Sequence, residues 1–223
     1  MRRVLFLALL ALALPIAASA SGIDIINQYG NIAFSNMFGT AGAGTIGATT
    51  ITSSQAQVKQ FTYLGSTLCK GSCGSVYFQT GTLASGTISG GGMFNGGGAF
   101  DIMGQGTFAN TLTGSKCGGG CALFTGSFSG PVTWTMIGTG PNPGELDYTL
   151  SGAIAGTLWN GRSVTGTTTQ NIYSYQGQLI AGIGHMNLPS NTHLTVPEPG
   201  TLGLLGSGLV GMAGMFRRKL MGA

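Results

Sequence analysis

The chain has 223 residues, of which 42 are glycine, and its formal net charge is +4. The positive excess comes from the two chain ends, because the charged residues between them cancel, and this excludes the basic surface of a nucleic-acid-binding protein. Those cancelling residues are Lys59, Lys70, Lys116, Arg162, Asp24, Asp101, Glu145 and Asp147. The glycines follow no three-residue period, which excludes collagen, and regular β-branched and aromatic residues argue against disorder.

Residues 1–20 have the pattern of a secretory signal peptide. Two arginines precede an apolar stretch at 4–14, and a proline and a small-residue cleavage site, Ala18-Ser19-Ala20, follow. A signal peptide with this order is removed from the mature protein. A retained membrane anchor is the alternative, but the stretch is short and a cleavage site follows at once. We therefore expect an exported domain over residues 21–188.

Short runs rich in Val, Ile, Thr, Phe, Tyr and Leu fill the exported domain, and glycine or another turn residue bounds each run. The predicted strands are 23–26, 31–38, 45–52, 56–64, 76–79, 83–88, 99–103, 108–112, 132–136, 148–158, 172–175 and 178–183. The clearest alternation is at 132–136, where Trp134 and Met136 are expected to face a core while two threonines face out.

These strands predict an all-β fold. Turn signals recur at a spacing of about 8 to 12 residues, which is typical of a sandwich or barrel, and no run shows helical periodicity with caps. We expect a single glycine-rich antiparallel β-sandwich-like domain. A β-solenoid is the alternative, because glycine-rich strands also suit stacked repeats.

The four cysteines form two pairs, Cys69 with Cys73 and Cys117 with Cys121, each with three residues between them. An even count in an exported chain favours disulfides. Structural zinc usually has a pair of ligands with two residues between them, so we expect no metal. The connectivity stays open: local bridges would clip two tight turns, whereas crossed bridges would close loops of about 48 residues and contribute about 4 kcal/mol through loop entropy.

Few residues could carry catalysis. His185 and His193 have no nucleophile motif near them and are expected to be exposed and non-catalytic. Glu145 and Asp147 could bind calcium from a Pro/Gly loop, although a solvated loop is the simpler interpretation. The glycine runs lack the Lys-Ser/Thr ending of a phosphate-binding loop. We therefore expect no enzyme activity and no cofactor.

Aromatic residues offer a possible sugar-binding surface, because sugars stack on flat rings. Trp134 is expected in the core. Trp159, beside Asn160 and Gly161 at a predicted turn, is the better candidate for ligand binding, although a structural role is the simpler interpretation.

The C-terminal segment has the order of a membrane address. After a linker at 189–195, Pro197-Glu198-Pro199 precedes an uncharged stretch at 201–216 and a basic block, Arg217-Arg218-Lys219. A spanning helix needs about 17 to 25 apolar residues, so this stretch is short, but basic residues retained on the cytoplasmic side support a transmembrane helix. A buried helix of a soluble domain would explain the apolar run but not the basic block.

Residues 196–219 resemble the PEP-CTERM sorting signal. The resemblance rests on the Pro-Glu-Pro group, the apolar stretch and the basic block, which together cover about a tenth of the chain. It implies recognition by an exosortase, which is an integral-membrane processing enzyme. It also implies export in a bacterium with two membranes and an association with exopolysaccharide or biofilm matrix.

These features predict a non-enzymatic protein of the cell surface or extracellular matrix, structural or adhesive, that is held in the membrane as a precursor. Its expected partners are the exosortase and exopolysaccharide, with no nucleic acid. A carbohydrate-binding module is the alternative. A glycoside hydrolase that uses two carboxylates is a third candidate.

Overall fold

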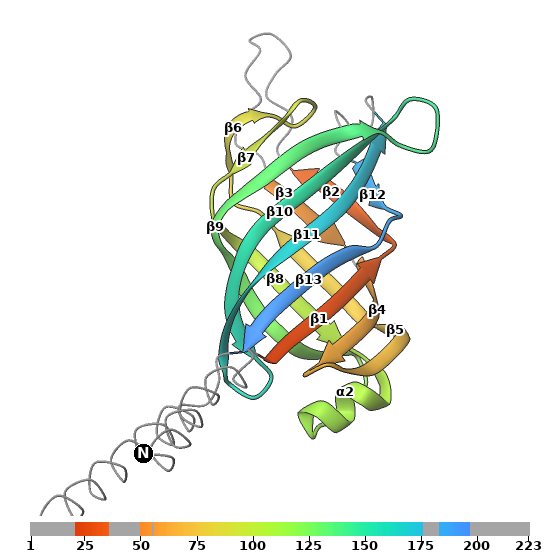
Figure 1. The fold of residues 1–223 in the computed structure, drawn as a ribbon, viewed down its shortest axis with the longest axis vertical. Helices are drawn as coiled ribbons and strands as arrows, with labels where there is room; N and C mark the ends of the chain where they lie inside the picture. The colour runs from red at the N-terminus through yellow and green to blue at the C-terminus, as the bar shows by residue number, and fades with distance from the viewer. Residues whose placement is uncertain (1–20, 36–49, 55, 176–182, 197–223) are drawn as a thin grey trace, which may run out of the picture. The chain divides into compact units, whose positions relative to one another are not determined.

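One β-sheet carries the body of the protein (Figure 1). The computed structural model describes residues 21–35, 50–54, 56–175 and 183–196, so the expected signal peptide and transmembrane helix lie outside it. Its elements are β1 (Ser21–Gln28), β2 (Gly30–Ser35), β3 (Thr50–Ser54), β4 (Ala56–Tyr63), β5 (Ser66–Gln79), β6 (Leu83–Thr87), β7 (Gly91–Phe94), β8 (Gly97–Gly104), α2 (Gly106–Thr113), β9 (Cys121–Thr139), β10 (Glu145–Leu158), β11 (Ser163–Tyr175), β12 (Ile183–Met186) and β13 (Ser190–Val196).

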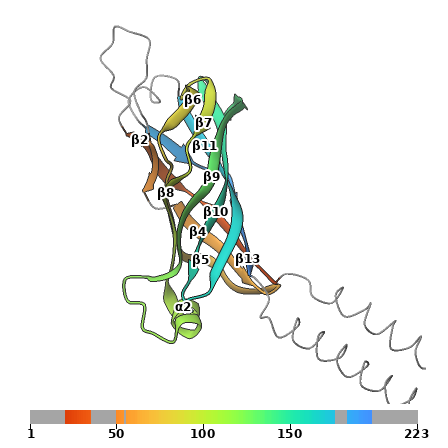
Figure 2. The same cartoon turned by 90° about the vertical axis from the view of Figure 1, so that its left-hand side faces the viewer.

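Eight strands form a closed antiparallel barrel in the order β1, β4, β5, β8, β9, β10, β11 and β13, and β13 is hydrogen-bonded to β1. Three short strands lengthen the wall, because β2 pairs with both β3 and β12. The β6–β7 hairpin adds to β9. Figure 2 shows this hairpin at one end of the barrel and α2 at the other.

The all-β prediction is confirmed, but the sandwich is wrong. A sandwich and a barrel need the same alternation of side chains and the same turns. The pairing of β1 with β13 distinguishes them, and it joins residues as far apart in sequence as Asp24 and His193, which are separated by 169 positions. The linker expected at 189–195 is also wrong, because Ser190–Val196 is the strand that closes the barrel.

Aromatic rings fill the barrel interior. Trp134 is 1% exposed and stacks on Tyr148 of the next strand, with ring centroids 4.5 Å apart, so its expected core position is confirmed. Gly126 and Gly156 face each other across β9 and β10. A Cβ atom added to either would lie 2.3 Å from a backbone carbonyl oxygen of the facing strand and 2.7 or 2.8 Å from the Phe124 ring, so glycine allows the close backbone approach and leaves room for that ring.

Two local predictions are wrong. Met136 is 45% exposed because Ile137 bulges out of the β9–β10 ladder beside it, and a bulge redirects neighbouring side chains. Residues 108–112 belong to α2 rather than to a strand. Gly106 and Gly114 bound this helix with left-handed φ values of 78° and 69°, and a short apolar run alone does not separate helix from strand.

A polar cluster lies among the inward-facing side chains. Asn27 Nδ2 donates to Gln170 Oε1 at 2.7 Å, and Gln170 Nε2 donates to Thr168 Oγ1 at 2.7 Å. The Thr168 and Thr192 hydroxyls are 2.8 Å apart. All four residues are at most 1% exposed. The cluster therefore joins β1, β11 and β13 at the seam where the barrel closes.

Gln170→Ala is expected to destabilise the barrel by about 2–3 kcal/mol, because it leaves the buried Asn27 and Thr168 groups unpaired. Thr167→Ala, which changes an exposed residue of the same strand, is the control and should cost less than about 0.5 kcal/mol. Urea unfolding followed by tryptophan fluorescence measures both. Equal free energies of unfolding for the two variants would contradict a stabilising role for the cluster.

Candidate functional site

Both disulfides bridge near neighbours, Cys69 with Cys73 and Cys117 with Cys121. The first closes a bulge in β5, where three consecutive residues stand opposite Lys59 of β4. The second closes the loop between α2 and β9. Of the two connectivities that the sequence leaves open, the structure therefore contains the local one, with one bridge across a bulge and the other across a loop.

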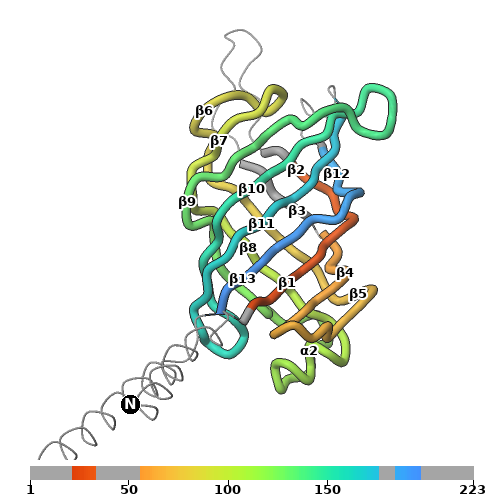
Figure 3. The backbone as a smooth tube through the Cα atoms, viewed as in Figure 1, coloured from red at the N-terminus to blue at the C-terminus, as the bar shows by residue number. Residues whose placement is uncertain are grey.

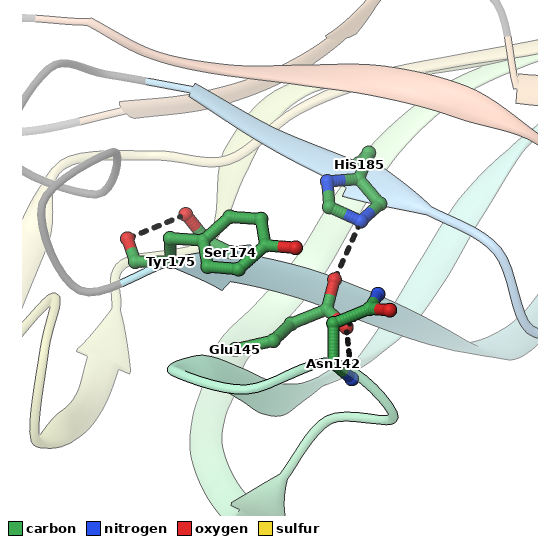
Figure 4. Close-up of polar contacts among 5 residues, drawn as sticks. All are labelled: Asn142, Glu145, Ser174, Tyr175 and His185. Atoms are coloured by element: carbon green, nitrogen blue, oxygen red, sulfur yellow. Dashed lines mark hydrogen bonds and ion pairs between the residues drawn. The ribbon is translucent and has the colours of Figure 1, made fainter.

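A buried carboxylate lies where β10 begins (Figure 4). Glu145 is 0% exposed, and its Oε2 accepts hydrogen bonds from the Asn142 backbone N–H at 3.2 Å and from Asn142 Nδ2 at 2.9 Å. His185 Nε2 lies 2.7 Å from Oε1, which is within ion-pair distance but lacks the alignment of a hydrogen bond. A buried charge needs such partners. Glu145 thereby ties the loop before β10 to β12.

Two tyrosines of β11 flank this pair. Glu145 lies opposite Tyr175, while Tyr173 lies opposite both Asp147 and His185. The ring centroids of Tyr173 and Tyr175 are 6.1 and 6.5 Å from that of His185. We call these five residues the Glu145 cluster.

Burial raises the pKa of two groups of the Glu145 cluster, Asp147 and Tyr173. It raises the pKa of the Asp147 carboxyl above its ordinary value, while a hydrogen bond from the Tyr148 backbone lowers the pKa and the Glu145 charge raises it further. Burial also raises the pKa of Tyr173, and the charges of Asp147 and Glu145 add to this effect. Perturbed pKa values occur at functional sites and in structural ion-pair networks alike.

The contacts of the Glu145 cluster connect parts of the fold, which is a structural role. Ser174 Oγ, beside it, donates to the Tyr175 carbonyl oxygen at 3.3 Å (Figure 4). The second histidine contacts a different carboxylate: His193 Nδ1 lies 2.6 Å from Asp24 Oδ1. Within the described ranges, no three His, Cys, Asp or Glu side chains gather as metal ligands.

Trp159 lies in the β10–β11 turn and is half-buried rather than fully exposed. Its ring meets Tyr63 edge-on, with centroids 5.5 Å apart, and its backbone N–H donates to the Leu123 carbonyl at 3.1 Å. Gly161 adopts a φ of 79° in this turn. The ring is therefore held at one end of the barrel with part of its surface open to a ligand.

An uncharged, hydroxyl-rich surface covers the outside of β9, β10, β11 and β13, which lie side by side in Figure 1. This hydroxyl wall consists of Thr133, Thr135, Thr149, Ser151, Thr167, Thr169, Asn171 and Asn191. Ser151 pairs with Thr133 on one side and Thr169 on the other, and Thr169 pairs with Asn191, so one row crosses all four strands. The Ser151 and Thr169 hydroxyls are 3.3 Å apart.

Sequence reasoning missed the hydroxyl wall. Its signal is present, because threonines and serines alternate with core residues along three of these strands. Alternation within one strand does not show which residues of other strands lie beside it. The strand order and register of the closed sheet determine that, and they place these side chains in continuous rows.

A family model described as the PEP-CTERM protein-sorting motif matches residues 195–219. No curated protein and no solved structure matches the chain. The described body is thus an eight-stranded β-barrel, and the matched segment after it is a sorting signal that implies export in a bacterium. This protein is a PEP-CTERM domain-containing protein, and the motif implies a membrane-anchored precursor that an exosortase processes.

The residues expected to carry the signal fall within the matched segment but outside the described residues. They are Pro197, Glu198, Pro199, Arg217, Arg218 and Lys219. In the part of the chain that the structure describes, no helix is long and apolar enough to cross a membrane.

Asp147→Asn is expected to stabilise the protein at pH 7. Because the folded state raises the pKa of this carboxyl, it binds the proton more tightly than the unfolded state, so stability falls as pH rises through the raised pKa. The gain should be less than about 1 kcal/mol after solvent screening, and it should vanish below the ordinary pKa of aspartate. Melting temperatures across pH measure it, with the exposed Asp24→Asn as control. A gain that grows on acidification would contradict this account.

Proposed function

We propose that this protein is a non-enzymatic, structural or adhesive component of the cell surface or extracellular matrix, in contact with exopolysaccharide. Export and sorting follow from the C-terminal motif. The observation that carries the finer proposal is the hydroxyl wall. Polysaccharides present closely spaced hydroxyls, and an ordered array of threonine, serine and asparagine groups can exchange hydrogen bonds with them at many points.

The geometry of the wall favours such multivalent contact. Neighbouring strands lie about 4.8 Å apart, so a row across four strands spans about 14 Å. Each hydrogen bond exchanged with water contributes little, but several weak contacts on one rigid surface add up to useful avidity. Since the wall carries no charge, this binding should depend little on salt.

The absence of enzyme activity belongs to the same proposal. Two features support it: Glu145 is held by Asn142 and His185, and His193 pairs with a different carboxylate on another part of the barrel. Neither imidazole is joined to a second catalytic group in these contacts.

A carbohydrate-binding module centred on Trp159 remains the narrower alternative. Its support is the partly open indole ring at the barrel end. Tyr63 meets that ring edge-on and does not extend it into a second flat platform. The two proposals predict different residues for sugar contact, so one binding experiment separates them.

The triple variant Thr133→Val, Thr167→Val and Thr169→Val is expected to weaken binding to purified host exopolysaccharide by at least about fivefold, because valine keeps the shape but loses the hydroxyls. Co-sedimentation of the processed protein measures it. The control is Thr62→Val with Thr67→Val, whose hydroxyls lie 3.4 Å apart on β4 and β5.

Unchanged binding by the triple variant, or binding lost in moderate salt, would contradict the proposed contact. Loss of binding in Trp159→Ala alone would instead favour the carbohydrate-binding module.

A further inference from the structure

We propose that one end of the barrel binds the anionic lipid surface of the bilayer that anchors the precursor. This tether end is where β1 begins and β13 ends, and it includes the β4–β5 turn, the β10–β11 turn, α2 and the loop after it (Figure 3). The inference goes beyond the adhesive role, because it concerns the precursor before processing. It rests on the membrane anchoring that the sorting motif implies.

Contacts join the parts of the tether end. The Leu64 N–H donates to the Gly22 carbonyl at 3.0 Å, so the β4–β5 turn touches the start of β1. The Tyr63 and Trp159 rings connect the same turn to the β10–β11 turn. Trp and Tyr side chains favour the interface between membrane and water, where one side of the ring is apolar and the other is hydrated.

The tip of the β4–β5 hairpin is an exposed leucine in a strained conformation. Leu64 has a φ of 52° and Gly65 a φ of 76°, in a two-residue turn that favours Asn-Gly. A left-handed leucine costs free energy, yet half of this apolar residue stays exposed to solvent. Leu68, on the following strand, is 40% exposed. Insertion between lipid headgroups would bury both leucines.

Charge on the barrel is divided between its ends. Two of the four cations of the body, Lys116 and Arg162, lie in the loops of the tether end, and Lys70 lies nearby on β5, opposite Gln60. The acid near them, Asp24, contacts His193, whereas Glu145 and Asp147 lie at the opposite end, where β10 begins, and Asp101 lies along the wall on β8. Basic residues beside a bilayer are attracted to anionic headgroups, so the tether end matches that surface in charge.

The chain between Val196 and residue 201 connects this end of the barrel to the expected membrane segment. Val196 ends β13, and the apolar stretch begins at residue 201. An extended chain covers at most about 3.6 Å per residue, so these five steps let the tether end move no farther than about 18 Å from the start of the stretch. The bilayer is therefore the occupant that this surface meets first.

The test uses the full precursor in vesicles of phosphatidylcholine with phosphatidylglycerol and, separately, of phosphatidylcholine alone. Quenching of tryptophan fluorescence by a headgroup-labelled lipid reports contact. The chain has two tryptophans, so Trp159→Phe leaves the buried Trp134 as the background. We expect quenching in the anionic vesicles to fall at least about twofold in Trp159→Phe.

Two further variants test whether the apolar tip and the lysines of the tether end bring Trp159 to the lipid surface. Leu64→Gly relieves the left-handed strain while removing the apolar tip, and Lys70→Gln with Lys116→Gln removes charge. Each should lower the quenching of Trp159 at least about twofold in anionic vesicles, whereas Lys59→Gln, over the Tyr29 ring, should not.

Quenching at the background level, or quenching unchanged by both variants, would overturn the inference. Either result leaves the exopolysaccharide experiment unaffected, because the threonines of the hydroxyl wall lie outside the changed residues.

Discussion

The pairing of β1 with β13 is the constraint on which the rest of the structure depends. It joins the first strand of the body to the last, so the eight-stranded wall has no open edge and its inner face can be filled with side chains. Asn27, Thr168, Gln170 and Thr192 hydrogen-bond across this seam. The same pairing makes residues 190–196 part of the folded domain, where a linker was expected.

Part of this fold could be predicted from local pattern. The core position of Trp134 follows from alternation, because a side-chain period of two is a property of each strand alone. Closure of the barrel could not be predicted, since it depends on a pairing between distant residues. Met136 and residues 108–112 were assigned wrongly for a related reason: a bulge at Ile137 and left-handed glycines override a pattern that is only a few residues long.

The candidate sites divide in the same way. The cysteine pairs were visible in the sequence, but only the bulge in β5 shows why a bridge between near neighbours suits them. Glu145 and His185 are 40 positions apart and meet only because β11 lies between β10 and β12. The barrel thus presents a neutral wall, the Glu145 cluster at one end and a basic, partly apolar surface at the other.

Hydrogen exchange measured by mass spectrometry on the full precursor tests closure most directly. In a closed barrel, residues 22–28 and 191–196 have a hydrogen-bonded strand on each side, so their amides should be protected to a degree similar to those of β9 and β10. Rapid exchange of both segments, with protection kept in β9 and β10, would show an open sheet and contradict the account.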